Sequence, residues 1–288
     1  MDIVRLIRPK QLIKNVFVFP ALLFSRMFLQ WAAVWHVLVA FVAFTFAAWC
    51  VYAFNDLIDA EADRAHPTKK LRPIAAGRIT PKQAICIIVF WLAAALAVAA
   101  LVNWMVLALI IAYLVINVLY SLWFKHHVLL DLFCIAAGFL LRIFAGGLAI
   151  SVMVSPWLLL CSLFLSLLLA SGKRRAELLL SLEENTDTAL RPVLRQYNLP
   201  FLDLLVNTSL TCLTMCYVLY ELLVNNGFWL SSIAIVLVCY ALFRYLYNVH
   251  VLHRGGSPEE VVLRDKSLLI SMALWLIVQV ARVIVLEG

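Results

Sequence analysis

The sequence predicts an all-α protein that spans a membrane many times, and two observations predict this class. Hydrophobic residues make up 65% of the 288-residue chain and charged residues only 14%, whereas soluble domains contain about 45–50% apolar and about 25% charged residues. The apolar residues also form long unbroken runs, such as 84–100 and 155–170. Because a crossing helix takes about 20 apolar residues, the composition has room for a bundle of about nine transmembrane helices.

The apolar runs place these helices along the chain in order. The expected helices are a short run from about residue 16, then 31–54, 83–101, 104–124, 129–150, 157–171, 202–224, 228–249 and 267–286. The first run contains Pro20, and Asn103 separates the fourth helix from the third. No Gly/Ser-rich linker interrupts the series, so residues 1–288 are interpreted as a single domain.

The charges of the chain lie between the apolar runs rather than within them. Lys and Arg number 23 against 16 Asp and Glu, a formal net charge of +7. The cations gather in clusters after alternate helices, the pattern of cytoplasmic loops in a membrane protein. We therefore predict a multi-pass protein of the inner (cell) membrane, with its amino terminus and active site cytoplasmic and with no nucleic acid as partner. The seven cysteines lie in apolar stretches without metal-ligand spacing and are interpreted as small core residues.

An acidic segment at the end of the second expected helix is the most informative part of the sequence. At about 100° per residue, Asn55, Asp56, Asp59 and Asp63 share one narrow wedge if the helix continues. Oxygen ligands of this kind suit Mg²⁺, which is bound by one or two carboxylates together with substrate phosphates. These four residues are the predicted metal ligands. The alternative is a solvated helix end whose acids pair with nearby Lys and Arg.

A basic loop at 66–78 follows the acidic segment. Arg offers a planar fork to phosphate oxygens, so a metal-bridged diphosphate could be held here from both sides. Arg64 and Arg72 lie closest to the carboxylates and are interpreted as phosphate ligands. For four further cations, charge that faces anionic lipid is an equally good interpretation; they are Lys69, Lys70, Arg78 and Lys82.

Two more polar groups belong to apolar runs, one deep within a run and one at the end of a run. Arg142 follows Asp131 by 11 residues, about 16 Å along a helix and about 20° around it, and a charge so deep in an apolar helix is a functional candidate by default. The alternative is a structural tie from Arg142 to an acid or the backbone. Lys173 and Glu177 are four residues apart, so they either bind substrate or pair with each other.

These groups share one side of the membrane, which suits a reaction between a water-soluble phosphorylated compound and a long apolar lipid. A transporter or flippase is less favoured, because only Arg142, Glu221 and Arg244 lie within apolar runs and no acidic relay crosses the membrane.

The pattern NDxxDxxxDR at 55–64, followed by RPIAAG at 72–77, resembles the first aspartate-rich motif of the UbiA superfamily of intramembrane prenyltransferases. The resemblance covers essentially the whole chain. Within the superfamily, RPKQ at 8–11, Lys14-Asn15, Tyr120-Ser121 with Lys125, Arg142 and GKRRAE at 172–177 are similar to the decaprenyl-phosphate phosphoribosyltransferases.

The resemblance implies a Mg²⁺-dependent transfer of the 5-phosphoribosyl group from phosphoribosyl pyrophosphate to a polyprenyl (decaprenyl) phosphate, with release of diphosphate. The residues implied as catalytic are Asp59, Asp63, Lys14 and Arg142. Those implied as substrate-binding are Lys14, Asn15, Arg64, Arg72, Tyr120, Lys125, Asp131, Arg142, Lys173, Arg174 and Glu177. How the basic residues divide between the 5-phosphate and the lipid phosphate stays open.

One departure bears on the substrate. Aromatic prenyltransferases of the superfamily carry a second aspartate motif, DxxxD, but here Asp131 is followed four residues later by Ile135. This favours a lipid with a single phosphate. Prenyl transfer from a polyprenyl diphosphate to an aromatic acceptor of the 4-hydroxybenzoate type stays the alternative. Chain length of the lipid and a homo-oligomeric state are left open.

Overall fold

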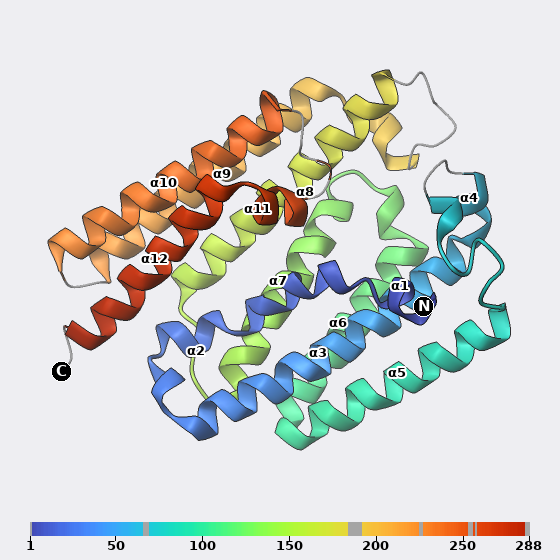
Figure 1. Ribbon diagram of the computed structural model, residues 1–288, viewed down its shortest axis with the longest axis horizontal. Coiled ribbons are helices and arrows are strands. Elements are labelled where there is room, and N and C mark those ends of the chain that lie inside the picture. Colours follow the sequence, from blue (N-terminus) through green and yellow to red (C-terminus); the bar gives the residue numbers. More distant parts are fainter. Residues whose placement is uncertain are drawn as a thin grey trace. The chain divides into compact units, whose positions relative to one another are not determined.

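The computed structural model describes residues 2–65, 69–183, 192–224, 227–252, 256 and 258–285. Every regular element in this part of the chain is a helix (Figure 1), which confirms the all-α class. The described residues form two compact units, the first from 2–154 with 192–193 and the second from 155–183 with 194–285. The units are described separately, and the interpretation of the chain as one domain stays a prediction.

Seven helices of the described residues are long and apolar enough to cross a membrane. They are α3 (Trp31–Ile58), α5 (Pro81–Val102), α6 (Trp104–Leu122), α7 (Leu130–Ala149), α8 (Pro156–Glu183), α9 (Leu199–Leu223) and α10 (Phe228–His250).

The expected number of about nine spans is not confirmed. The expected first span is a 3₁₀ helix, η1 (Pro9–Val18), followed by the short α2 (Pro20–Phe24) and η2 (Met27–Leu29). Pro20, at the start of α2, interrupts the run, since proline cannot continue a helix that precedes it. The expected last span is a helix, α12 (Lys266–Val285), which carries Lys266 and Arg282 and is not among the seven.

Helix α3 forms the centre of the first unit. In its apolar stretch 56% of the residues are buried, against 11% in α5, so α3 packs inward while α5 shows most of its surface. Its buried face is rich in alanine, and small side chains let neighbouring helices approach closely. The core of the unit joins α3 with α5, α6, α7 and η1. The contact between α3 and α5 runs along both helices (Figure 1).

Asn103 marks the sharp break between α5 and α6. Its side-chain oxygen accepts a hydrogen bond from Val106 N–H at 2.8 Å and so caps the amino terminus of α6. Its amide nitrogen donates to the carbonyl of Leu148, near the end of α7, at 2.9 Å. One neutral side chain therefore ties together the ends of three helices.

The amino-terminal segment is held on α7 and α3. A Cβ atom added to Gly146 of α7 would meet the Val18 carbonyl oxygen of η1 at 1.8 Å, so the two backbones touch at this point. Before η1, the helix α1 (Asp2–Ile7) buries Leu6 in a small cluster with Ala53 of α3, Ile74, Ile79 and Ala84. This cluster connects α1 to the loop that precedes α5.

The second unit contains α8 to α12, with α11 spanning Pro258–Arg264 and with most of η6 (Pro192–Gln196). Helix α8 continues to Glu183, well beyond the expected end at 171, because the added turns consist mainly of strong helix formers. The core joins apolar residues of α8, α9, α10, α11 and α12.

A buried polar network lies among α9, α10 and α12 in the second unit. Arg282 pairs with Glu221 at 2.8 Å, and these side chains are 5% and 0% exposed. Tyr217 donates to the Glu221 carboxylate at 2.7 Å, and Gln279 donates to it at 3.0 Å. Arg282 also lies near the hydroxyl of Ser231 on α10. The network crosslinks the three helices.

Candidate functional site

The predicted metal ligands lie at the end of α3 and on the short α4 (Ala60–Ala65). Asp59 interrupts the helix, with φ −87° and ψ 4°. The backbone bonds nevertheless continue: Asp59 N–H donates to the Asn55 carbonyl at 2.9 Å, and Asp63 N–H donates to the Asp59 carbonyl at 2.8 Å. Asn55, Asp59 and Asp63 therefore follow one another at intervals of one turn on the same side of the segment.

Two arginines bind the carboxylates that are buried. Arg8 of the amino-terminal segment pairs with Asp56, whose side chain is only 2% exposed. Arg72 of the basic loop lies 3.1 Å from Asp56 and 2.6 Å from Asp63 through the same nitrogen. Arg8, Asp56, Arg72 and Asp63 thus form a chain of alternating charges that joins three segments far apart in the sequence.

The remaining two predicted ligands are held by residues at the end of α6. Lys125 Nζ lies 2.7 Å from Asp59 Oδ1. The hydroxyl of Ser121 donates to the side-chain oxygen of Asn55. Lys125 belongs to η4 (Phe124–His126), so the end of α6 and the end of α3 meet at the site.

The oxygen donors at this site suit a hard divalent cation, although not all of them are equally available. Among the described residues, no three carboxylate, His or Cys side chains gather closely enough to hold a metal by themselves. Mg²⁺ needs only one or two carboxylates when phosphates and waters complete its shell. Asp59 is 39% exposed and Asn55 is one turn away, whereas Asp56 is enclosed by two arginines. Asn55 and Asp59 fit the predicted metal better than Asp56. Asp63, whose side chain is 6% exposed and 2.6 Å from Arg72, would have to exchange that partner to bind a metal.

The loop of 69–79 is fixed from several directions. Arg64 donates from Nε to the carbonyl of Ala75 at 3.3 Å, so this predicted phosphate ligand holds the loop. Arg78 donates to the Leu71 carbonyl at 2.7 Å and pairs with Asp2 of α1 at 2.8 Å. Residues 66–68, the first part of the predicted basic loop, lie outside the described residues.

Arg142 is buried in α7, 4% exposed, and its guanidinium is surrounded by hydrogen-bond acceptors and aromatic rings. It donates to Asn15 Oδ1 at 2.8 Å, to the Gly138 carbonyl at 2.6 Å and to the Tyr113 hydroxyl at 3.0 Å. The guanidinium carbon lies 4.7 Å from the centre of the Tyr113 ring and 5.5 Å from that of Phe44. These contacts match the structural tie that the sequence left open, here to Asn15 and the backbone.

Asn15 extends this tie to α3. It donates to the hydroxyl of Thr45 at 3.2 Å, so Arg142, Asn15 and Thr45 connect α7, η1 and α3. Lys14 precedes Asn15 on η1, the segment that Arg142 holds. Asp131 is fully buried in the first turn of α7, and Tyr120 is half-buried near the end of α6. The roles of these residues toward substrate stay predictions.

The predicted residues Lys173, Arg174 and Glu177 lie on α8 of the second unit. Arg174 is 1% exposed and pairs with Glu177 at 2.9 Å. Arg175 pairs with Asp203 of α9 and donates to the carbonyl of Val249 at 3.3 Å.

Sequence reasoning missed four of these participants: Arg8, Ser121 as a partner of Asn55, Arg175 and Asp203. The signal for Arg8 was present, because it begins the RPKQ segment at 8–11 that is similar to the phosphoribosyltransferases. In the structure its backbone is left-handed, with φ 48°. No spacing in the sequence connects Arg175 with Asp203, since 28 residues separate them.

A family model and the curated relatives of this chain point to the same family. Residues 17–172 match the model of the UbiA prenyltransferase family. The chain is 36% identical over 288 residues to the decaprenyl-phosphate phosphoribosyltransferase of Mycolicibacterium smegmatis, covering 95% of this chain and 90% of the relative. It is 35% identical over 282 residues to the Corynebacterium glutamicum protein of the same name, covering 94% and 83%.

Solved structures share the fold at lower identity. A UbiA homolog from Archaeoglobus fulgidus bound to GPP and Mg²⁺ is similar with a TM-score of 0.74 and 19% identity, over 99% of this chain and 100% of that one. A digeranylgeranylglyceryl phosphate synthase structure gives a TM-score of 0.61 at 20% identity, over 98% of both chains. With seven apolar helices among its described residues the chain is an integral membrane protein, and it belongs to the UbiA prenyltransferase family.

Proposed function

We propose that this protein transfers the 5-phosphoribosyl group of phosphoribosyl pyrophosphate to a polyprenyl phosphate, and that this lipid is decaprenyl phosphate. The observation that carries the proposal is the identity of 35–36% to two decaprenyl-phosphate phosphoribosyltransferases along almost the whole chain. The alternating acids and bases at the ends of α3 and α6 support it, because they offer binding groups for both a metal and phosphates.

The reaction needs a leaving diphosphate, a reactive sugar carbon and an ionised acceptor. The bond between C1 of the ribose and the diphosphate oxygen breaks, and its electron pair leaves with the diphosphate. A bond forms between C1 and a phosphate oxygen of the lipid. Since that oxygen is already ionised, no general base has to remove a proton.

The chain's cations stabilise the charge that develops on the diphosphate. Lys125 and Arg72 lie beside the stacked carboxylates and are part-exposed, so each can exchange its carboxylate partner for a phosphate oxygen. Asn55, Asp59 and Asp63 would hold Mg²⁺, which supplies electrostatic stabilisation of the leaving group when bound. Arg8 and Asp56 keep Arg72 in position.

Arg142 and Asn15 serve this site through the segment they hold. Their hydrogen bond fixes η1, the element that carries Lys14. We propose Lys14 as a phosphate ligand and Arg142 as a positioning residue for it. Lys173 and Arg174 stay candidates for the 5-phosphate or the lipid phosphate.

We also propose that the site faces the cytoplasm and that the membrane is the inner membrane. The clusters of Lys and Arg at the ends of alternate spans support this orientation, since such clusters stay on the cytoplasmic side.

The decisive experiment offers two donors to the purified protein. We expect diphosphate release, and a phosphoribosylated lipid by mass spectrometry, from phosphoribosyl pyrophosphate with decaprenyl phosphate and Mg²⁺. The matched reaction contains a polyprenyl diphosphate with 4-hydroxybenzoate. Turnover in the second mixture alone would assign the chain to aromatic prenyl transfer, and diphosphate release in neither mixture, by a folded sample, would contradict both activities.

A further inference from the structure

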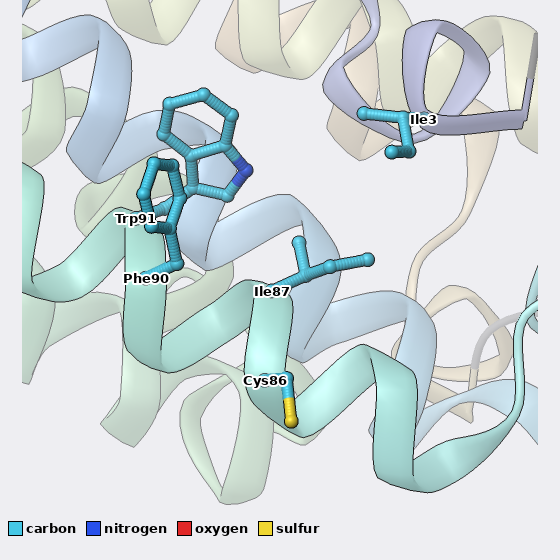
Figure 2. Close-up of a pocket in the computed structure, with 5 residues that line it drawn as sticks. All are labelled: Ile3, Cys86, Ile87, Phe90 and Trp91. Carbon is cyan, nitrogen blue, oxygen red and sulfur yellow. The ribbon is translucent and has the colours of Figure 1, made fainter.

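An apolar groove lies between α1 and α5, on the outside of the first unit. It has a volume of about 270 Å³ and is lined by Ile3 of α1 and by Cys86, Ile87, Phe90 and Trp91 of α5. Figure 2 shows Ile3 on one side and the α5 residues on the other. The lining lacks charged side chains, so the groove suits a hydrocarbon rather than a phosphorylated compound.

The groove opens on a helix surface that faces lipid. Only 11% of the apolar stretch of α5 is buried, and its residues Val89 and Phe90 are 57% and 62% exposed. Ile3 and Val4 of α1 are also more than half exposed. Cys86, which the sequence suggested to be a core residue, is exposed in the structure. A groove in such a surface is filled by hydrocarbon chains of the bilayer, because water has no polar partner there.

An exposed cation, Lys82, lies one turn before the groove on α5. Lys82, Cys86 and Phe90 follow at intervals of four on α5, so they lie on one face of the helix. Lys82 is exposed in the first turn, and within the described part of the chain no acid pairs with it. An ammonium group one turn above an apolar groove complements a lipid with an anionic headgroup and hydrocarbon chains.

We propose that this groove binds one anionic phospholipid of the bilayer, with its headgroup at Lys82 and part of an acyl chain against Ile3, Phe90 and Trp91. The charged end of the groove is Lys82 and not Lys125 or the carboxylates, which separates this lipid from the lipid that reacts. The groove volume is somewhat below the roughly 300–1,000 Å³ of pockets that enclose a whole small ligand. The groove therefore holds only part of the acyl chain, and the rest of that acyl chain lies in the bilayer.

The bound lipid stabilises the amino-terminal segment. Leu6 of α1 shares a cluster with Ile74 and Ile79 of the basic loop, and α1 leads directly to Arg8, the partner of Asp56. An acyl chain that contacts both Ile3 and α5 adds a link between α1 and the rest of the unit. Since it binds the folded protein, it raises the unfolding temperature.

The experiment measures lipid binding by native mass spectrometry in a neutral detergent, with phosphatidylglycerol and phosphatidylcholine of the same acyl chains as probes. We expect the wild type to retain one phosphatidylglycerol in preference to phosphatidylcholine. Lys82→Gln should weaken phosphatidylglycerol binding about fivefold, the effect of one basic residue near an anionic surface. Lys266→Gln is the matched control, an exposed lysine at the start of α12, and should bind as the wild type does.

A second pair of variants tests the groove itself. Phe90→Ala removes one wall, whereas Val89→Ala changes an equally exposed neighbour that does not line the groove. We expect weaker phosphatidylglycerol binding in Phe90→Ala and unchanged binding in Val89→Ala. In the wild type, we expect added phosphatidylglycerol to slow the alkylation of Cys86. Equal retention of the two lipids, equal effects of Phe90→Ala and Val89→Ala, or displacement of phosphatidylglycerol by decaprenyl phosphate would each overturn the proposal. None of these readouts depends on enzymatic activity.

Discussion

Asp56 and Asp59 are three residues apart and have opposite environments. Asp56 is 2% exposed and is bound by Arg8 and Arg72, whereas the Asp59 side chain is 39% exposed and is bound by Lys125. A carboxylate enclosed by two guanidinium groups stabilises the fold, while one that is accessible can exchange its partner for an ion. The two aspartates therefore have different expected roles in the same motif.

This difference predicts opposite effects of two conservative variants. Asp56→Asn leaves the part-buried Arg8 without its carboxylate and leaves Arg72 with Asp63 alone, and it should lower the free energy of unfolding by about 1–3 kcal/mol. Asp59→Asn should change stability little and should reduce diphosphate release at least about tenfold, since it removes the charge of a proposed metal ligand. Thermal unfolding and the phosphoribosyl transfer assay measure the two effects, and equal stability of the two variants would contradict the assignment.

The sequence was least informative about which side chains pair with each other at the site. The spacing of Asn55, Asp59 and Asp63 predicted their common face, because their relation is local. The partners of Asn55 and Asp59, Ser121 and Lys125, each lie 66 residues away, and Arg8 lies 48 residues from Asp56. Only the packing of helices brings these residues together. Pairings of that kind have no signature in a single sequence.

Among the elements, η1 lies in direct backbone contact with α7. Gly146→Ala would place a methyl group 1.8 Å from the Val18 carbonyl oxygen, so η1 would have to move away from α7. We expect a loss of stability of several kcal/mol and a loss of activity, since Lys14 and Arg8 lie on or next to η1. Gly138→Ala on the same helix is the control, because an added Cβ there meets its nearest atom, on the Arg142 side chain, at an ordinary contact distance of 3.4 Å. Equal melting temperatures for the two variants would show that η1 is not held by this contact.

The start of α12 supplies a prediction on pH. Asp265 accepts hydrogen bonds from Asn248, Arg244 and the Leu268 N–H. Burial acts to raise the pKa of this carboxyl, but the hydrogen bonds outweigh it and hold the pKa below its ordinary value of 3.8. A lowered pKa contributes stability that is complete above 3.8 and is lost as the pH falls through the folded-state value.

We therefore expect Asp265→Asn to be less stable than the wild type at neutral pH and to approach it in acid. Thermal unfolding between neutral pH and about pH 2 measures the difference, in a range that brackets the ordinary pKa of aspartate. A constant difference across that range would contradict a role for the ionised carboxylate.

Some helix boundaries could be predicted from the sequence and others could not. The break at Asn103 was expected and is present, because a polar residue between two apolar runs is a local signal. The extension of α8 to Glu183 was missed, since the apolar run ends near 171 while helix propensity continues through charged residues. Hydropathy indicates where a helix leaves lipid, and propensity indicates where it ends.

For the whole molecule, composition was sufficient for the class and insufficient for the number of spans. The expected first span is a short run that Pro20 interrupts, so it consists of the end of η1, α2 and η2. Composition counts residues and cannot tell a continuous helix from an interrupted one. The family, by contrast, was predicted from the short motif at 55–64 and 72–77, because few other kinds of site require acidic and basic residues at that spacing.

The buried pair of Glu221 and Arg282 supplies a prediction for the stability of the second unit. Glu221→Gln removes one charge and leaves the Arg282 guanidinium buried, which should cost about 3–5 kcal/mol. Replacing both at once, as Glu221→Leu with Arg282→Met, should cost much less, since breaking a buried pair is worse than removing it. Thermal unfolding of the single and double variants in detergent checks this order, and a double variant less stable than the single one would contradict it.

The neutral cap at Asn103 has a consequence for how the chain enters the membrane. An aspartate would cap α6 equally well, but it could not donate to the Leu148 carbonyl, and it would carry a charge. If the α5–α6 connection lies on the far side of the bilayer, as the distribution of cations indicates, it must cross the hydrocarbon core during insertion. A charged residue there costs about 2.5–3.5 kcal/mol at the centre of the core. With asparagine at this position, the α5–α6 hairpin crosses the hydrocarbon core without that cost. The Asn103 side chain can then cap the amino terminus of α6 on the far side.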